Sequence, residues 1–175
     1  MSDADAIDLA LLLLRLGVGV VMLAHGIRHI FGGGKIKGTA GWFGSMGMRM
    51  PLLQAWLASL TEIGAGVLLV LGLMTPLAGA GVVGVMAVAL IINHLKNGFF
   101  IFYKGEGYEY VMTLLLCGIA VGTIGPGSWS LDDALEINDD LIGTTGLLIA
   151  LGAGGLGALL LLALFWRPVK KPTSA

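Results

Sequence analysis

The sequence predicts an all-α fold, a polytopic bundle of transmembrane helices. Three observations predict this class: hydrophobic residues make up 57% of the 175 residues, charged residues make up 12%, and the mean hydropathy is +0.93. A soluble domain carries about 25% charged residues, so this chain has too few to cover a water-exposed surface. Long uniform apolar runs favour helices over barrel strands, since a helix satisfies its backbone groups within one segment. The net charge of −1 argues against a nucleic-acid partner.

Five apolar runs are long enough to cross a hydrocarbon core, which takes about 20 helical residues. The spans are expected at residues 9–28, 53–73, 77–96, 109–127 and 142–166. The first span follows an acidic start without the basic region of a cleaved signal peptide, so we expect it to be retained. This divides the chain into a membrane domain of four spans at 1–140, and a further span with a polar cytoplasmic tail at 141–175.

The charged residues separate cleanly between the two sides that five spans create. One side holds nine of the ten basic residues: Arg28, Lys35, Lys37, Arg49, Lys96, Lys104, Arg167, Lys170 and Lys171. The other side holds only acidic residues: Asp3, Asp5, Asp8, Asp132, Asp133, Glu136, Asp139 and Asp140. Because cytoplasmic loops are rich in lysine and arginine, we expect the N-terminus outside and the C-terminus in the cytoplasm.

Two ionisable residues lie deep inside spans, Arg15 in the first and Glu62 in the second. A charged group in lipid is costly unless it is paired or hydrated, so each is a candidate for a functional site. Counted from the cytoplasmic ends of the spans, Arg15 lies about 18 Å deep and Glu62 about 14 Å deep. We therefore expect the two to pair. Such a pair could lock the bundle, or it could carry protons or bind a ligand.

The stretch LAHGIRHIFGGGKIKG, residues 23–38, places His25 and His29 four residues apart on one helix face. His94 ends the third span on the same side, and Glu109, beside Tyr108, begins the fourth. We expect His25, His94 and Glu109 to meet in one polar pocket, with His29 at its rim. The pocket could hold a transition metal through the three histidines and Glu109. It could instead bind a quinone or another lipid-borne ligand, with Tyr108 contributing. The alternative is that these side chains are ordinary residues of a membrane interface.

Two further segments carry local signals. In SWSLDDALEI, residues 128–137, Ser130 stands three residues before Asp133, which is typical of a helix N-cap and predicts a short acidic helix. The last span contains six glycines, and small residues allow close helix packing in lipid. We expect this span to contact a partner protein or a second copy of the chain.

Seven short motifs follow one another in a recognisable order. They are Arg15 with Gly17, HG at 25–26, Glu62 with Gly64 and Gly66, GLMTP at 72–76, NGFF at 97–100, GYEY at 107–110 and GPGSWSLD at 125–132. Together they resemble the DoxX family of small bacterial membrane proteins, especially its actinobacterial branch, over residues 9 to 135. The resemblance implies a four-helix core in the plasma membrane, to which this chain adds a fifth helix. Many members carry a lysine in place of His29, so a role for His29 would be specific to this branch.

The resemblance also implies an association with redox complexes. Members include the small membrane subunit of a thiosulfate–quinone oxidoreductase, and others are associated with superoxide dismutase and with thiol-oxidative stress. With one cysteine, Cys117, and no flavin or haem-attachment motif, the chain is not expected to be an enzyme on its own. Two hypotheses follow. The protein is an accessory membrane subunit of a respiratory or oxidative-stress complex, or it is a small carrier or lipid- or quinone-binding protein that uses the Arg15–Glu62 pair and the histidine pocket. Partner subunits would support the first, and a homo-oligomer with bound lipid the second.

Overall fold

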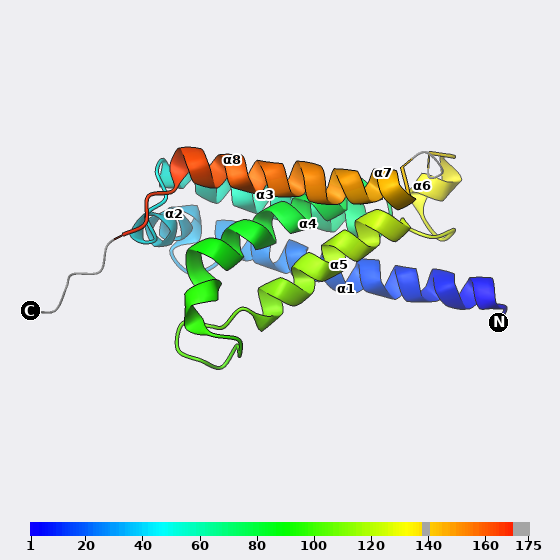
Figure 1. Ribbon diagram of the computed structural model, residues 1–175, viewed down its shortest axis with the longest axis horizontal. Coiled ribbons are helices and arrows are strands. Elements are labelled where there is room, and N and C mark those ends of the chain that lie inside the picture. The colour runs from blue at the N-terminus through cyan, green and yellow to red at the C-terminus, as the bar shows by residue number, and fades with distance from the viewer. Residues whose placement is uncertain (138–140, 170–175) are drawn as a thin grey trace, which may run out of the picture.

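The computed structural model describes residues 1–137 and 141–169, and in these residues the chain is a bundle of helices with no strand (Figure 1). The elements are α1 (Asp3–Phe31), α2 (Lys35–Ser45), α3 (Pro51–Leu71), α4 (Thr75–Ala89), the π-helix η1 (Leu90–His94), the 3₁₀-helix η2 (Leu95–Asn97), α5 (Glu109–Ile124), α6 (Leu131–Ala134), α7 (Gly143–Leu147), the π-helix η3 (Leu148–Ala153) and α8 (Gly154–Phe165).

The predicted fold class is confirmed. Within the described residues, four helical units are long and apolar enough to cross a membrane: α1, α3, the unit Thr75–Asn97 and the unit Gly143–Phe165. The predicted fourth span forms α5, which is shorter, with 16 residues. It ends three residues earlier than predicted because Gly125 adopts a φ of 90° and Pro126 follows.

One helix was not predicted. The residues between the first two predicted spans, 29–52, include a break of three glycines at 32–34 and were expected to form a loop, but Lys35–Ser45 form α2. Gly32 does end α1, and Gly34 turns the chain with a φ of 47°. The sequence of α2 contains three glycines, which are poor helix formers, so local propensity does not predict it. Contacts of α2 with α1 and α3 stabilise it instead.

Glycines set how the helices pack, as the composition predicts for a membrane bundle. A side chain at Gly19 would lie 3.0 Å from the carbonyl oxygen of Gly66, so α1 and α3 cross closely at this point. One at Gly154 would lie 2.5 Å from the carbonyl oxygen of Ala80, which places α8 tightly on α4. Part of the glycine surface of the last helix is therefore used inside the molecule, rather than being free for a partner.

The last helix is also tied to the segment that follows α2. The backbone N–H of Arg49 donates to Phe165 at 2.7 Å, and that of Arg167 donates to Gly47 at 2.9 Å. The indole of Trp166 donates to the carbonyl of Met46 at 3.0 Å. The helix beyond the expected four-helix core is thus an integral part of the fold.

The ends of the bundle differ in charge. The N-terminus and α6 lie at one end in Figure 1, whereas α2, the 98–108 loop and the end of α8 lie at the other. Among the described residues the acidic group predicted for one side lies at the first end, and the basic loop residues lie at the second; four members of the two groups, Asp139, Asp140, Lys170 and Lys171, lie outside the described residues. The predicted N-cap is confirmed, since Ser130 Oγ accepts from the backbone N–H of Asp133 at the start of α6.

Candidate functional site

The predicted pair between Arg15 and Glu62 is wrong. Arg15 is fully buried, and its guanidinium donates to the carbonyl oxygens of Leu69, at 3.1 Å, and Trp129, at 2.7 Å. Glu62 lies far along the bundle, beside Gly26 of α1. Arg15 and Gly26 are eleven residues apart, about 16 Å along the helix axis. The depth comparison failed mainly because it assumed that the two helices start level, whereas their packing brings Gly19 to Gly66 and Gly26 to Glu62; the extension of α1 to Phe31 adds only about 4.5 Å.

Arg15 belongs to a structural cluster at the acidic end of the bundle. The nearby Asp132, which is 1% exposed, accepts hydrogen bonds from the backbone N–H groups of Met74 and Thr75 and from the hydroxyl of Thr75. These contacts cap the N-terminus of α4. Arg15 is thus held by backbone carbonyls beside a capped turn, and it does not line the cavity described next.

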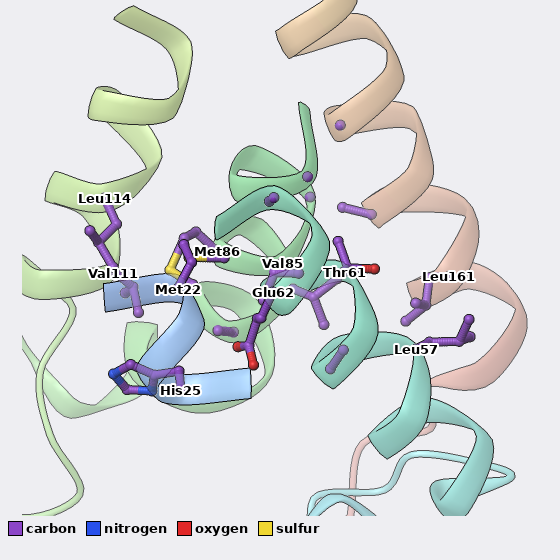
Figure 2. Close-up of a pocket in the computed structure, with 18 of the residues that line it drawn as sticks. Met22, His25, Leu57, Thr61, Glu62, Val85, Met86, Val111, Leu114 and Leu161 are labelled. Carbon is purple, nitrogen blue, oxygen red and sulfur yellow. The ribbon is translucent and has the colours of Figure 1, made fainter. Parts of the chain in front are cut away.

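A cavity of about 640 Å³ lies inside the bundle, in the size range of small-molecule sites. Side chains of α1 to α5, of η1 and of α8 line it, and most of them are apolar. Figure 2 shows Met22 and His25 of α1 near Val111 of α5 at one side of the view, with Glu62 nearer the centre. The polar residues of the lining are His25, His29, Gln54, Thr61, Glu62, Asn93, His94, Glu106 and Tyr110.

Glu62 provides the buried carboxylate of this cavity, whereas Glu106 is exposed. It is 3% exposed, and its Oε2 atom lies 3.5 Å from Nε2 of His29 without a hydrogen bond of good geometry to any described residue. The imidazole of His29 is half-buried, stacked on Trp42 at a centroid distance of 6.4 Å and edge-on to Phe43 at 6.1 Å. A carboxylate beside an imidazole in an apolar setting can share a proton with it, or it can accept one from a ligand.

Gln54 is the functional candidate that the sequence did not reveal. It is 2% exposed, and neither its amide nitrogen nor its amide oxygen has a hydrogen-bond partner among the described residues. It lies eight residues before Glu62 on the same face of α3, about 12 Å along the axis. A buried amide without partners costs free energy, so this position suits a ligand. In the sequence, the one signal for a role of Gln54 was its position as a single glutamine within an apolar run.

The three histidines all line the cavity, although each has its own surroundings. His25 is exposed, and its Nε2 atom lies 3.4 Å from the hydroxyl of Tyr110. His94 is 9% exposed, within the π-helix η1, and its Nδ1 atom lies 2.9 Å from the carbonyl oxygen of Glu106. His25 therefore faces a side chain at the start of α5, whereas His94 faces the backbone of the loop that precedes α5.

Glu109 and Tyr108 do not belong to the cavity. The Glu109 carboxylate accepts from the backbone N–H of Ile101 at 2.8 Å, and the Tyr108 ring packs edge-on against Phe99 at 5.4 Å. Both side chains thus support the 98–108 loop, because that loop folds back onto the start of α5. The expectation that Glu109 joins the histidines is wrong, and Glu62 takes its place.

The structure does not assemble the predicted set of metal ligands. No group of three or more histidine, cysteine, aspartate or glutamate side chains is placed to hold a metal ion within the described residues, which include His25, His29, His94 and Glu109. The histidines are distributed around one cavity instead of converging on one point. The arrangement offers hydrogen-bond donors and acceptors at several places along an apolar space.

Comparison with known proteins identifies one family. A family model described as DoxX matches residues 10–95, which run from α1 to η2 and include Arg15, the three histidines, Gln54 and Glu62. α5 and the unit Gly143–Phe165 lie beyond the match, as do the motifs at 97–132. No match was found among curated proteins or among solved structures.

Proposed function

The chain belongs to the DoxX family, and we propose that it is an accessory subunit of a redox membrane complex that binds a quinone inside its helix bundle. The observation that carries the proposal is the apolar cavity of about 640 Å³ into which Gln54 and Glu62 bring buried polar atoms that have no hydrogen-bond partner among the described residues. Nearly all buried polar groups in proteins are hydrogen-bonded. A ligand with polar atoms at these places would complete the site.

A quinone fits the chemistry of the lining. Its carbonyl oxygens accept hydrogen bonds, which the Gln54 amide and the imidazole of His29 can donate. The hydroxyls of the reduced form donate, and the Glu62 carboxylate and the Gln54 amide oxygen can accept. The carboxylate disfavours an anionic headgroup, such as that of a phospholipid, in the same place. The site can therefore hold both redox forms of a neutral head.

The proposed role is binding, and electron transfer is assigned to partner subunits. The alternative, a carrier that uses the Arg15–Glu62 pair, loses its main support because these residues do not meet. A carrier that uses the His29–Glu62 pair remains the second candidate, since these two groups lie within 3.5 Å of each other. Purification in native lipid separates the two: a stoichiometric partner subunit supports the complex, and a homo-oligomer alone supports the carrier.

We also propose that the protein resides in a bacterial plasma membrane with its basic end in the cytoplasm. The support is the separation of charge between the two ends of the bundle, because positive loops remain on the cytoplasmic side. In this orientation His25, His29 and His94 lie toward the cytoplasm, where protons could reach the cavity.

Quinone content tests the binding proposal. We expect wild-type protein purified in native lipid to retain quinone, measured by solvent extraction and mass spectrometry per mole of protein. Glu62→Met and Gln54→Met replace buried polar groups that have no hydrogen-bond partner among the described residues by apolar side chains of similar size, so the substitutions break no hydrogen bond of the fold. Each is expected to lower the quinone content about tenfold, the effect of about 1.4 kcal/mol.

The matched control is Ser59→Ala on the same helix. Ser59 is buried like Glu62, but it bonds to its own helix through Ala55 and does not line the cavity. Its quinone content should equal that of the wild type. Wild-type protein with no more quinone than an unrelated membrane protein would refute the proposal, as would unchanged content in both methionine variants.

A further inference from the structure

The cavity reaches the outside of the bundle between α3 and α8. Five of its lining residues are exposed along these two helices: Leu57, Thr61 and Gly64 on α3, and Ala153 and Gly157 around the start of α8. α3 and α8 each pack against α4, but they scarcely touch each other. We call these five residues the lateral opening. Figure 2 shows Leu57 and Thr61 of α3 at the same side of the view as Leu161 of α8.

The lateral opening lies near the middle of α3 and of the helical unit Gly143–Phe165, which ends with α8. Thr61 is ten residues from each end of α3, and Ala153 is ten residues from the start of the 23-residue unit Gly143–Phe165. Neighbouring residues of both helices present apolar side chains outward, as Leu60 and Leu156 do at 58% and 62% exposure. In a spanning bundle this depth is occupied by hydrocarbon, not by headgroups or water. Whatever passes through the opening must therefore be apolar.

The opening is continuous with the polar part of the cavity. Its floor is α4, where Gly81 packs against Thr61 and Ala65 of α3, Gly84 packs against Gly154 of α8, and both glycines line the cavity. Glu62 follows Thr61 directly on α3 and points inward to His29, whereas Thr61 is exposed. A ligand with its head at Glu62 thus has an apolar path to the lipid along α4.

We infer that the lateral opening holds the prenyl tail of the bound quinone and admits the ligand directly from the bilayer. The inference rests on the proposed function and adds the subsite for the tail. A prenylated quinone has a polar head and an apolar tail. Because the opening lies at mid-bilayer depth beside the buried Glu62 carboxylate, the head can enter the cavity while the tail stays in the hydrocarbon. One wall comes from α3, inside the matched family region, and the other comes from the helical unit Gly143–Phe165, outside it, so the subsite requires this last helix of the chain.

Four glycines provide the test variants and their matched controls. A side chain added at Gly64 or Gly157 would meet nothing within 4 Å, and both positions line the cavity at the opening. Gly64→Phe and Gly157→Phe should therefore obstruct the opening without disturbing the packing. Gly17 and Gly155 are equally free of neighbours but do not line the cavity, so Gly17→Phe and Gly155→Phe are the matched controls.

The probes are two naphthoquinones with the same head, one without a tail and one with a prenyl tail. Binding is measured for the purified protein in lipid nanodiscs, after thermal unfolding has shown that the variants are folded. We expect the two obstructed variants to bind the prenylated probe about tenfold more weakly, a loss of about 1.4 kcal/mol. Their affinity for the tail-less probe should stay within about twofold of the wild type, and the controls should bind both probes normally.

The outcomes separate the inference from the proposed function. If the wild type binds both probes and the obstructed variants bind the prenylated probe normally, the tail does not use the opening and the inference is wrong. Equal loss of both probes in the obstructed variants would also overturn it, because the effect would then lie at the head site. If the wild type binds neither probe, the proposed quinone function itself fails.

Discussion

Arg15 and Asp132 hold the turn between α3 and α4 from two sides, and the structure predicts that they are energetically coupled. Arg15 donates to Leu69 at the end of α3, and the backbone N–H of Asp132 donates to Gly72, which follows. A side chain at Gly72 would collide with the guanidinium of Arg15. The two residues thus share one turn, whereas Glu62 shares no contact with Arg15. A double-mutant cycle distinguishes these relationships.

The magnitudes follow from the hydrogen bonds that are lost. Asp132→Ala removes three hydrogen bonds to a buried carboxylate, so it should lower the free energy of unfolding by about 4.5 kcal/mol, at about 1.5 kcal/mol for each. Arg15→Met removes two, for a loss of about 3 kcal/mol on the same scale. We expect the double variant to lose less than the sum by at least about 1 kcal/mol, since residues of one network couple. Arg15→Met combined with Glu62→Gln should be additive within about 0.5 kcal/mol.

The assay is reversible unfolding in mixed detergent micelles, followed by circular dichroism for the wild type, the single variants and both double variants. The coupling energy is the difference between the loss in a double variant and the sum of the two single losses. Additive losses for Arg15 and Asp132 would refute the shared-turn argument. A coupling above about 1 kcal/mol between Arg15 and Glu62 would show that they interact after all.

Two further predictions address packing and orientation. Gly154→Leu should lower the free energy of unfolding by about 2 kcal/mol, because the new side chain would press on the backbone of α4. The control Gly155→Leu should leave the free energy of unfolding nearly unchanged, because that position has no neighbour within 4 Å. Equal unfolding midpoints for the two variants would contradict the observed packing. In a Cys117→Ser background, a cysteine at Asp133 should react with an impermeant thiol reagent in intact cells, and one at Lys104 should react only after the cells are opened; the reverse pattern would overturn the proposed orientation.

The candidate site was only partly predictable from the sequence. Counting residues along apolar runs placed the three histidines near one end of the bundle, because span length is a property of each segment alone. The same counting could not show that Glu109 would turn to the 98–108 loop, or that Gln54 would face the cavity. Those outcomes depend on the rotation of each helix about its axis, which its neighbours set. α2 was missed for a related reason, since contacts with α1 and α3 stabilise a glycine-rich segment of weak propensity.

Taken by itself, the sequence determined the class of the protein, the positions of its apolar spans, the glycine break after α1 and the separation of charge between the two ends. Each of these depends on local composition, since every segment partitions between lipid and water largely on its own hydropathy. Only the tertiary structure decided which groups meet. Close contacts such as those of Gly19 with Gly66 set the axial shift of α1 against α3, and that shift places Glu62 beside His29 and leaves Arg15 about three turns away. The lateral opening beside Glu62 has the same origin. It exists because the packing of the helices leaves α3 and α8 apart, and the sequence pattern of a single helix does not determine that packing.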